Sequence, residues 1–253
     1  MSKPLVSLLM AAYNTVGFVA AAIKSVQAQT HDNWELLIQD DGSTDGTYEL
    51  ACALATADPR IKVETNGRNL GVNLTLKAVA SRATGDFHAH FDSDDLLERY
   101  AIEETLREFE RHPKVMLIYS DMAQIARDGD LHSYQIENYS ASFNFDPNAL
   151  YNCGWRHFGM YRAEVKKHIH GYNEKLSIVP GCGDGDFFMQ VVEKFPAKRL
   201  PKVLYYYRNH GTNISRKIGK CEECPANPDC NYIRVWAKSA KLDQRTLQPL
   251  KKR

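Results

Sequence analysis

The chain has 253 residues, of which 43% are hydrophobic and 25% are charged, and its formal net charge at pH 7 is +1. This length can bury one large hydrophobic core, or one core with a small appendage. The near-zero net charge excludes the overall positive field that is typical of nucleic-acid-binding proteins. No apolar run approaches the roughly 18 residues of a membrane span and no signal peptide starts the chain, which favours a cytoplasmic protein.

The first half of the sequence alternates between the patterns of strands and helices. Strands are expected at residues 5–10, 35–39, 61–65, 86–91 and 115–120, and helices through residues 18–26, 48–55, 71–83 and 96–111. Asn14 or Thr15 is expected to cap the first helix, because both side chains can accept a hydrogen bond from backbone N–H groups. The alternation predicts a parallel sheet with right-handed crossovers, and ligands gather at the carboxyl ends of such strands.

The second half of the sequence is less regular. Asp128-Gly129-Asp130 is typical of a hairpin turn, and residues 137–160 are aromatic, polar and irregular. Helices are expected near residues 163–169 and 186–194, and a last strand is expected at residues 202–208. The end of the chain is basic, which favours a solvated tail and, as a second interpretation, weak peripheral attraction to the inner face of a membrane.

Three aspartates follow the alternating run at residues 86–91, in the sequence Asp92-Ser93-Asp94-Asp95. Carboxylates that are clustered at the end of a strand repel one another and raise each other's pKa. A divalent cation such as Mg²⁺ or Mn²⁺ removes that repulsion, because oxygen ligands suit these ions. The alternative is a solvated acidic turn that caps a helix beginning near Leu96.

Several segments of the chain together resemble a known family. They are Val6–Asn14, Asp40–Asp45, Phe91–Asp95, His112–Val115, Gly171–Glu174, Gly183–Asp186 and Tyr207–Ser215. In this order they are similar to the opening strand, the nucleotide-base loop, the DxD motif, the segment after the following helix, two acceptor-side motifs and the closing motif of the family 2 glycosyltransferases. The resemblance extends over about residues 4–216.

The resemblance implies an α/β protein with the GT-A fold, in which a single Rossmann-like, mostly parallel sheet is flanked by helices. It implies a glycosyltransferase domain over residues 1–216, with a nucleotide-sugar-binding half at about residues 1–120 and an acceptor-binding half at about residues 121–216. Residues 217–253 are then a basic C-terminal extension that contains cysteines.

The resemblance also implies a site that binds a nucleotide sugar. Its expected members are Ala11, Tyr13, Asp41, Lys77, Asp92 and Ser93, with Asp94 and His210 as ligands of Mn²⁺ or Mg²⁺. Asp41 can accept the imide N–H of uracil and Tyr13 can stack on the base, the alternatives being a turn residue and a half-buried aromatic residue. Lys77 is either a phosphate contact or a solvated lysine. Asp95 is expected to cap a helix or to contact and orient the residues that bind the metal ion.

Transfer of a sugar also requires a base that takes the proton from the attacking hydroxyl. Asp184 is the expected base, because it aligns with the aspartate of the family's Glu-Asp pair, while Asp186 is the competing candidate and otherwise a helix N-cap. The sequence departs from the family's pattern at Gly183 and Gly185, which stand where a glutamate and an aromatic residue are common. Direct displacement with one base predicts a product with inverted anomeric configuration.

Three cysteines, Cys221, Cys224 and Cys230, lie close together after the family's motifs end. Their spacing is typical of a metal site, but a structural Zn²⁺ needs four ligands. The hypothesis is a structural zinc site with Cys153 or Cys182 as the fourth ligand. The alternatives are three reduced thiols or a regulatory disulfide.

The leading interpretation is therefore a metal-dependent, inverting hexosyl- or N-acetylhexosaminyltransferase of polysaccharide biosynthesis, with a UDP-sugar as the favoured donor. The acceptor is expected to be a hydroxyl of a glycan or of a lipid-linked molecule, and no nucleic acid is expected as a partner. A nucleotidyltransferase of related fold would need a glycine-rich, basic loop after the first strand, which residues 10–15 do not form. A non-catalytic sugar- or partner-binding module is the third alternative.

Overall fold

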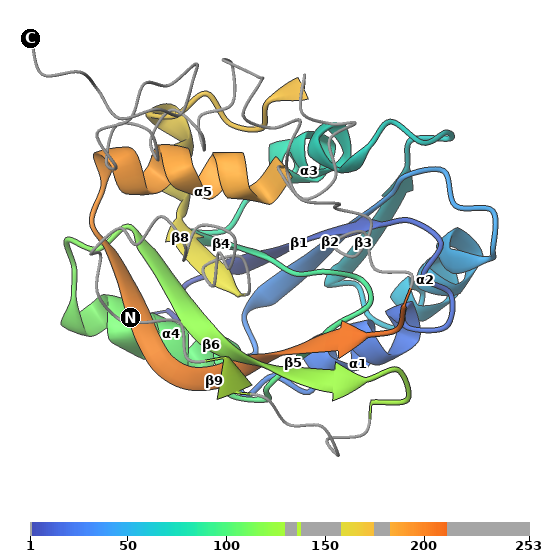
Figure 1. Ribbon diagram of the computed structural model, residues 1–253, viewed down its shortest axis with the longest axis horizontal. Coiled ribbons are helices and arrows are strands. Elements are labelled where there is room, and N and C mark those ends of the chain that lie inside the picture. The colour runs from blue at the N-terminus through green and yellow to red at the C-terminus, as the bar shows by residue number, and fades with distance from the viewer. Residues whose placement is uncertain (1, 130–135, 138–157, 175–182, 212–253) are drawn as a thin grey trace, which may run out of the picture.

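A computed structural model of the chain describes residues 2–129, 136–137, 158–174 and 183–211 (Figure 1). The strands are β1 (Val6–Ala12), β2 (Trp34–Asp40), β3 (Ile61–Thr65), β4 (Phe87–His90), β5 (Leu96–Leu97), β6 (Leu117–Ala126), β7 (Ile136–Glu137), β8 (Gly159–Arg162) and β9 (Ala197–Asn209). The helices are α1 (Val19–Gln27), α2 (Thr47–Ala55), α3 (Val72–Ser81), α4 (Ala101–Arg111) and α5 (Gly183–Lys194), with a 3₁₀ helix at Ala163–Lys167. Within the described residues the strands form one sheet in the order β3-β2-β1-β4-β8-β6-β9-β5, and β7 pairs with β6.

The strands of the first half, β3, β2, β1 and β4, are all parallel to one another. β2 is buried along its whole length and β1 along nearly all of it, which explains their near-continuous apolar sequences. Because the strands are parallel, their carboxyl ends meet at one edge of the sheet, at Ala12, Asp40 and His90. The predicted strand–helix alternation of the first half is confirmed.

The second half of the sheet is mixed. β8 lies between β4 and β6 and runs antiparallel to both. β9 runs parallel to β6 and curls around the lower left of the molecule in Figure 1, from the Leu117–Ala197 pair to the Ala126–Asn209 pair. It begins five residues before the predicted strand at 202–208, because β6 offers a pairing partner along this whole stretch. This long pairing brings His210, directly after β9, to the acidic turn that follows β4.

The sheet separates the hydrophobic core into two clusters, and helices cover both faces. On one face α1 and α4 contribute buried side chains such as Ile23 and Phe109. On the other face α3 and α5, which lie above the sheet in Figure 1, contribute Leu76 and Phe188. No helix in the described part of the chain is long and apolar enough to cross a membrane.

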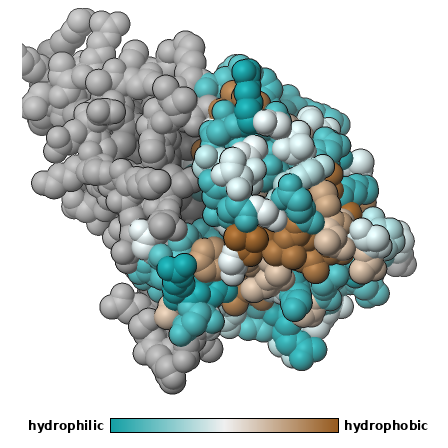
Figure 2. Space-filling model, turned by 90° about the vertical axis from the view of Figure 1, so that its right-hand side faces the viewer, coloured by the Kyte–Doolittle hydropathy of each residue, from teal (hydrophilic) through white to brown (hydrophobic). Residues whose placement is uncertain are grey.

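One outer face of the molecule, on the right of Figure 1, is drawn in Figure 2. Hydrophobic side chains form a band across the middle of this face, between hydrophilic ones. Among the described residues, three large apolar or aromatic side chains are exposed to solvent: Tyr13, Val16 and Tyr100.

The predicted helix start near Leu96 is wrong. Leu96 and Leu97 form β5, which pairs with Tyr206 and Tyr205 of β9, and α4 begins only at Ala101. The backbone of these leucines thus finds its partner in a strand about 110 residues later in the chain. Local periodicity contains no sign of that partner.

The predicted side-chain cap of the first helix is also wrong. α1 begins at Val19, and Phe18 is its N-cap residue without a side-chain cap hydrogen bond. The carbonyl oxygen of Thr15 accepts the N–H groups of Phe18 and Val19 instead, at 2.8 and 2.9 Å. Asn14 has a left-handed backbone, with φ of 52°, and its side chain accepts the N–H of Thr44 at 2.9 Å. Asn14 therefore ties the loop after β1 to the loop after β2.

One further prediction in the second half is modified, and the described residues agree with another. The helix expected near residues 163–169 is a short 3₁₀ helix, Ala163–Lys167. The N–H of Gly129 donates to the carbonyl oxygen of Ala126 at 3.0 Å and β7 is antiparallel to β6, as expected of a hairpin, while Asp130 lies outside the described residues.

Candidate active site

The acidic turn after β4 presents its aspartates to different surroundings. Asp92 is exposed, Asp94 is partly exposed and Asp95 is fully buried. The carboxylate of Asp95 accepts the backbone N–H of Arg208 at 2.7 Å and the hydroxyl of Tyr205 at 2.6 Å. Burial, together with the negative charges of Asp94 and Asp92, raises the pKa of Asp95 well above its ordinary value of 3.8.

Asp95 is therefore not a helix cap. The N-cap residue of α4 is Tyr100, and it makes no side-chain cap hydrogen bond. Asp95 instead fixes the acidic turn against β9, which matches the other expectation for this residue, a support behind the ligands. The hydroxyl oxygen of Tyr205 also lies 3.2 Å from Oδ2 of Asp92, so one β9 side chain contacts two of the three aspartates.

His210 lies directly at the acidic turn. Its Nε2 is 2.8 Å from Oδ2 of Asp94. The imidazole stacks on the ring of Phe18, with the centroids 4.4 Å apart and the planes at 28°. Arg208 donates from Nε to the carbonyl oxygen of Asp94 at 2.9 Å, and its guanidinium lies 5.5 Å from the centre of the Phe18 ring. The two predicted metal ligands are thus brought together by β9 and α1.

A carboxylate and an imidazole at this distance fit one divalent cation. Among the described residues, no group of three His, Cys, Asp or Glu side chains is close enough to hold a metal ion by itself. Two protein ligands suffice for Mg²⁺ or Mn²⁺ in a nucleotide site, because substrate phosphates and water complete the coordination shell. The two protein ligands, Asp94 and His210, therefore suit an ion that is shared with a diphosphate. They suit less well an ion that is held by protein side chains alone.

Asp41 is buried where β2 ends and is already engaged by the chain itself. Its carboxylate accepts the N–H groups of Leu70 and Gly71, at 2.8 and 2.9 Å, and the side-chain amide of Asn66 at 2.8 Å. Asp40 supports the same turn through the N–H groups of residues 42 and 43. The contacts of Asp41 are thus those of a residue that stabilises a turn, as one of the two sequence alternatives states. A uracil N–H would be an additional hydrogen-bond donor to the same carboxylate.

The other predicted nucleotide-sugar residues lie around this edge of the sheet. Tyr13 is 43% exposed just after β1, in the position of an open stacking surface. Ala11 pairs with Gln39 inside the sheet. Ser93 is buried and its Oγ accepts the hydroxyl of Thr15 at 3.0 Å, which joins the loop after β1 to the acidic turn.

Lys77 has a partner that neither sequence alternative included. Its Nζ forms an ion pair with the carboxylate of Glu174, and both side chains are 57% exposed. Asn73, one turn earlier on α3, donates to the carbonyl oxygen of Asn173 at 2.8 Å. The Gly171–Glu174 motif is therefore held against α3 by these two contacts.

The two candidate bases occupy different environments in the first turn of α5. Asp184 is partly exposed, and its Oδ1 accepts the N–H of Gly185 at 2.8 Å. Asp186 is fully buried, and its Oδ2 accepts the side-chain amide of Gln190 at 3.0 Å. Because α5 begins at Gly183, Asp186 lies inside the helix and is not its N-cap. The partly exposed carboxylate of Asp184 is accessible to a substrate, whereas the carboxylate of Asp186 is hydrogen-bonded within α5.

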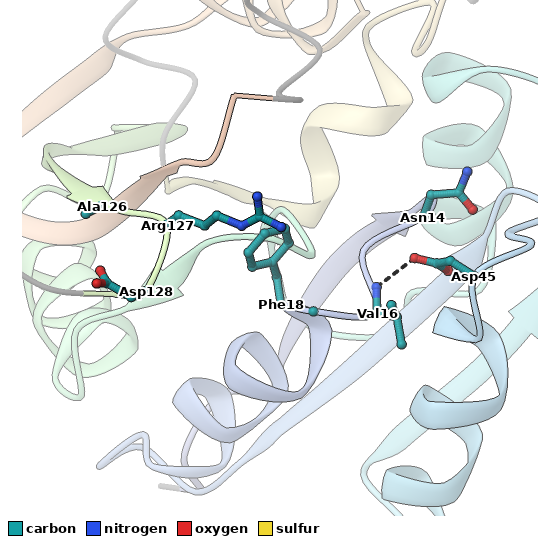
Figure 3. A pocket seen from close by; sticks show the side chains of 8 residues that line it. Asn14, Val16, Phe18, Asp45, Ala126, Arg127 and Asp128 are labelled. Carbon is teal, nitrogen blue, oxygen red and sulfur yellow. Dashed lines mark hydrogen bonds between the residues drawn. The ribbon is translucent and has the colours of Figure 1, made fainter.

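A pocket of about 740 Å³ opens beside Phe18 (Figure 3). Asn14 and Asp45 line one side, and Ala126, Arg127 and Asp128 line the other. Oδ2 of Asp45 accepts the N–H of Val16 at 3.0 Å, which fixes the loop that forms the pocket floor.

Sequence reasoning missed Phe18 and Tyr205 as parts of this site, and it included Arg208 in the closing motif without giving it a role. Tyr205 lies two residues before that motif, and this proximity was the available signal. The cysteines proposed for zinc, Cys221, Cys224 and Cys230 with Cys153 or Cys182, lie outside the described residues.

Comparisons with known proteins identify the family of the chain. The sequence model of glycosyl transferase family 2 matches residues 7–169. The chain is 30% identical over 216 residues to the chondroitin synthase of Escherichia coli, across 85% of this chain and 30% of that protein. It is 30% identical over 219 residues to the hyaluronan synthase of Pasteurella multocida, across 85% of this chain and 22% of that protein. The chain thus spans less than a third of the length of these relatives.

Solved structures with low sequence identity share the fold. S. aureus TarS in complex with UDP-GlcNAc matches with a TM-score of 0.72 and 16% identity, over 96% of this chain and 68% of that chain. The mannosyltransferase PcManGT from Pyrobaculum calidifontis, in complex with GDP-Man and Mn²⁺, matches with a TM-score of 0.60 and 17% identity, over 81% of this chain and 57% of that chain. The predicted GT-A fold is confirmed. Because the family model covers more than half of the sequence, from β1 to the segment after β8, the chain belongs to glycosyl transferase family 2.

Proposed function

We propose that the protein transfers a hexosyl or N-acetylhexosaminyl group from a nucleotide diphosphate to a hydroxyl of a glycan or lipid-linked acceptor, with inversion at the anomeric carbon. The observation that carries the proposal is the contact of His210 with Asp94 at the acidic turn, where the carboxyl ends of parallel strands meet. Such an edge is where α/β folds bind nucleotides.

A UDP-sugar is the favoured donor. Asp41 and the exposed ring of Tyr13 stand at the end of the nucleotide half, where a base would lie. TarS is solved with UDP-GlcNAc, and the names of two relatives, chondroitin synthase and hyaluronan synthase, denote polysaccharide synthases. PcManGT is solved with GDP-Man, so a guanosine donor is the competing possibility that the experiment must address.

Asp94 and His210 would hold the divalent cation together with the donor's phosphates. When bound, Mn²⁺ or Mg²⁺ neutralises charge on the leaving diphosphate. Asp92 is exposed beside these ligands and would contact the ribose. Asp95 and Tyr205 keep the turn in place, because their mutual hydrogen bond anchors it to β9.

Asp184 would act as the general base. It takes the proton of the acceptor hydroxyl while that oxygen forms the bond to the anomeric carbon, and the bond from this carbon to the diphosphate oxygen breaks with its electron pair. A single displacement inverts the configuration. Partial exposure of Asp184 supports this role, and the full burial of Asp186 speaks against the competing candidate.

The proposal is tested by a donor screen in the presence of Mn²⁺ that measures released nucleotide from UDP-, GDP- and dTDP-sugars with and without acceptor extracts. The expected result is release of UDP that increases with one class of acceptor and is lost after chelation and in Asp94→Asn. Equal release with and without metal would contradict metal dependence. Absence of release from every donor, with purified and folded protein, would contradict the transferase activity.

A further inference from the structure

Two histidines of β4, His88 and His90, are buried on the face of the sheet that α5 covers. His90 is 5% exposed. Four aromatic rings surround its imidazole, with centroids 4.8 to 5.9 Å away: Tyr161, Tyr172, Phe187 and Phe188. These rings come from β8, from the Gly171–Glu174 motif and from α5, so three separate segments meet at one histidine.

The imidazole of His90 makes one specific polar contact in this aromatic cage. Its Nε2 is hydrogen-bonded to the hydroxyl of Tyr172. Its Nδ1 is buried and has no hydrogen-bond partner among the residues that the structure describes. Burial lowers the pKa of His90 to about 4, although the nearby Asp184 carboxylate opposes this shift. The ring is thus neutral at physiological pH, and an apolar side chain would fill the cage without leaving a buried nitrogen unpaired.

The cage is directly connected to the first turn of α5. Phe187 and Phe188 follow Asp184 by three and four residues, so their side chains lie on the same side of the helix as Asp184, one turn further on. Phe187 also stacks on Tyr172, with centroids 4.8 Å apart and planes at 18°. Any change in the packing around His90 therefore reaches the helical turn that carries Asp184.

We propose that His90 is a positioning residue for Asp184, which it orients through its hydrogen bond to Tyr172 and its contacts with Phe187 and Phe188. This inference rests on the proposed function, because it takes Asp184 as the base. It assigns a role to a buried polar side chain that the donor site does not use. It also explains why the strand before the acidic turn carries histidine in the middle of an aromatic cluster.

His90→Leu and Tyr172→Phe test the proposal, with His88→Leu as the matched control. His88 lies two residues earlier on the same face, is 1% exposed and contacts Tyr161, so its replacement tests loss of a buried histidine without loss of the contact to Tyr172. We expect His90→Leu to lower kcat by roughly 10- to 100-fold, because misplacement of a catalytic group by about 1 Å has effects of this size. The KM for the donor should change by less than about twofold, since the ring contacts and the hydrogen bond of His90 that the structure describes are made to residues outside the acidic turn.

The decisive measurement is the same substitution in the Asp184→Asn background. If His90 acts through Asp184, His90→Leu lowers kcat of Asp184→Asn by less than about twofold, because residues that act as a unit are non-additive. His90→Gln, which can keep a hydrogen bond near the position of Nε2, should recover part of the rate. Amide hydrogen exchange of residues 187–194 of α5, whose N–H groups are bonded within the helix, should become faster in His90→Leu and Tyr172→Phe than in His88→Leu, a readout that needs no turnover.

Two outcomes would overturn the inference. One is an equal loss of kcat on His90→Leu in the wild-type and Asp184→Asn backgrounds, and the other is a loss of kcat in His88→Leu as large as in His90→Leu. Failure of the proposed function looks different: the wild-type protein would release no nucleotide, or Asp184→Asn would keep the full rate. In that case, unchanged hydrogen exchange in His90→Leu would still reject the structural link between His90 and α5.

Discussion

Nε2 of His210 lies 2.8 Å from Oδ2 of Asp94, although 116 residues separate them in the sequence. The contact exists because β9 runs along β6 and ends beside the acidic turn. Phe18 and Arg208 limit the freedom of both partners, through ring stacking on His210 and a hydrogen bond to the carbonyl oxygen of Asp94. The site is thus assembled from a helix N-terminus, a turn and a strand that are far apart in the chain.

Asp94→Asn should abolish the Mn²⁺-dependent part of UDP binding and leave the fold intact. The substitution removes the charge that a cation requires, while the hydrogen bond from Arg208 to the backbone of residue 94 remains. Calorimetric titration with UDP, with and without Mn²⁺, measures the effect. Asp86→Asn is the matched control, because Asp86 lies just before β4 and accepts the N–H of Leu5 at 2.9 Å. Equal Mn²⁺ dependence in wild type and Asp94→Asn would show that the ion is held elsewhere.

Asp184→Asn and Asp186→Asn should have different consequences. Asp184→Asn should lower the transfer rate by roughly 10²–10⁴-fold with unchanged donor binding, the usual effect of losing a positioned base. Asp186→Asn should instead lower the free energy of unfolding by roughly 1–3 kcal/mol, because it disturbs a buried hydrogen bond to Gln190.

Steady-state kinetics and urea denaturation of both variants separate these effects. NMR of the first-turnover product with the wild-type protein reports the anomeric configuration. A retained configuration, or a larger rate loss in folded Asp186→Asn than in Asp184→Asn, would refute the assignment of the base.

Gly42→Ala should destabilise the protein and weaken nucleotide binding. Gly42 has a φ of +71°, and a Cβ at this position would lie 2.5 Å from backbone atoms of Arg68. We expect a loss of more than about 1 kcal/mol from the left-handed backbone alone, and the displaced turn carries Asp41. Gly17→Ala is the control, since no heavy atom lies within 4 Å of its added Cβ. Thermal unfolding and UDP titration should separate the two variants, and equal stability would show that the turn can adapt.

The free energy of unfolding should fall as the pH decreases from about 6.5 to about 4. Burial lowers the pKa values of His88 and His90 to about 4 in the folded protein, from an ordinary value of 6.5. Between these two pH values the unfolded chain binds more protons, so protonation favours unfolding with a slope of up to about 1.4 kcal/mol per pH unit for each histidine. Asp95 opposes this dependence, because its raised pKa lets the folded protein keep a proton that the unfolded chain releases above about pH 3.8. The contribution of a histidine is therefore isolated by comparing the wild-type protein with a histidine variant.

Urea denaturation at several pH values between about 4.5 and 7.5 measures how the free energy of unfolding depends on pH. This is roughly the range in which histidine side chains ordinarily titrate. Glu35 and Asp58 have pKa values of about 2 in the folded protein, below their ordinary values of 4.5 and 3.8. The stability that these carboxylates contribute is therefore lost mainly below the pH range of the experiment. His88→Leu should reduce the slope by about one proton. Equal slopes in the wild-type protein and in His88→Leu would mean that His88 binds protons in the folded protein as it does in the unfolded chain.

The strands and helices of the first half and the order of the motifs could be predicted from the sequence. β1 and β2 could be predicted because strands that are buried on both faces need near-continuous apolar sequences, and this requirement is local. The acidic turn could be located for the same reason, since polar residues directly after a buried strand lie at the edge where ligands bind.

Which residues meet at that edge, and which contacts each carboxylate makes there, depend on how distant segments pack together. Leu96 and Leu97 are a strand and not a helix because β9 pairs with them, and Asp95 is a buried support and not a cap because Tyr205 and Arg208 reach it. Asp184 and Asp186 have the same side chain two residues apart, yet one is partly exposed and the other is fully buried. Burial and long-range pairing depend on which elements pack together, and local periodicity carries no information about those partners.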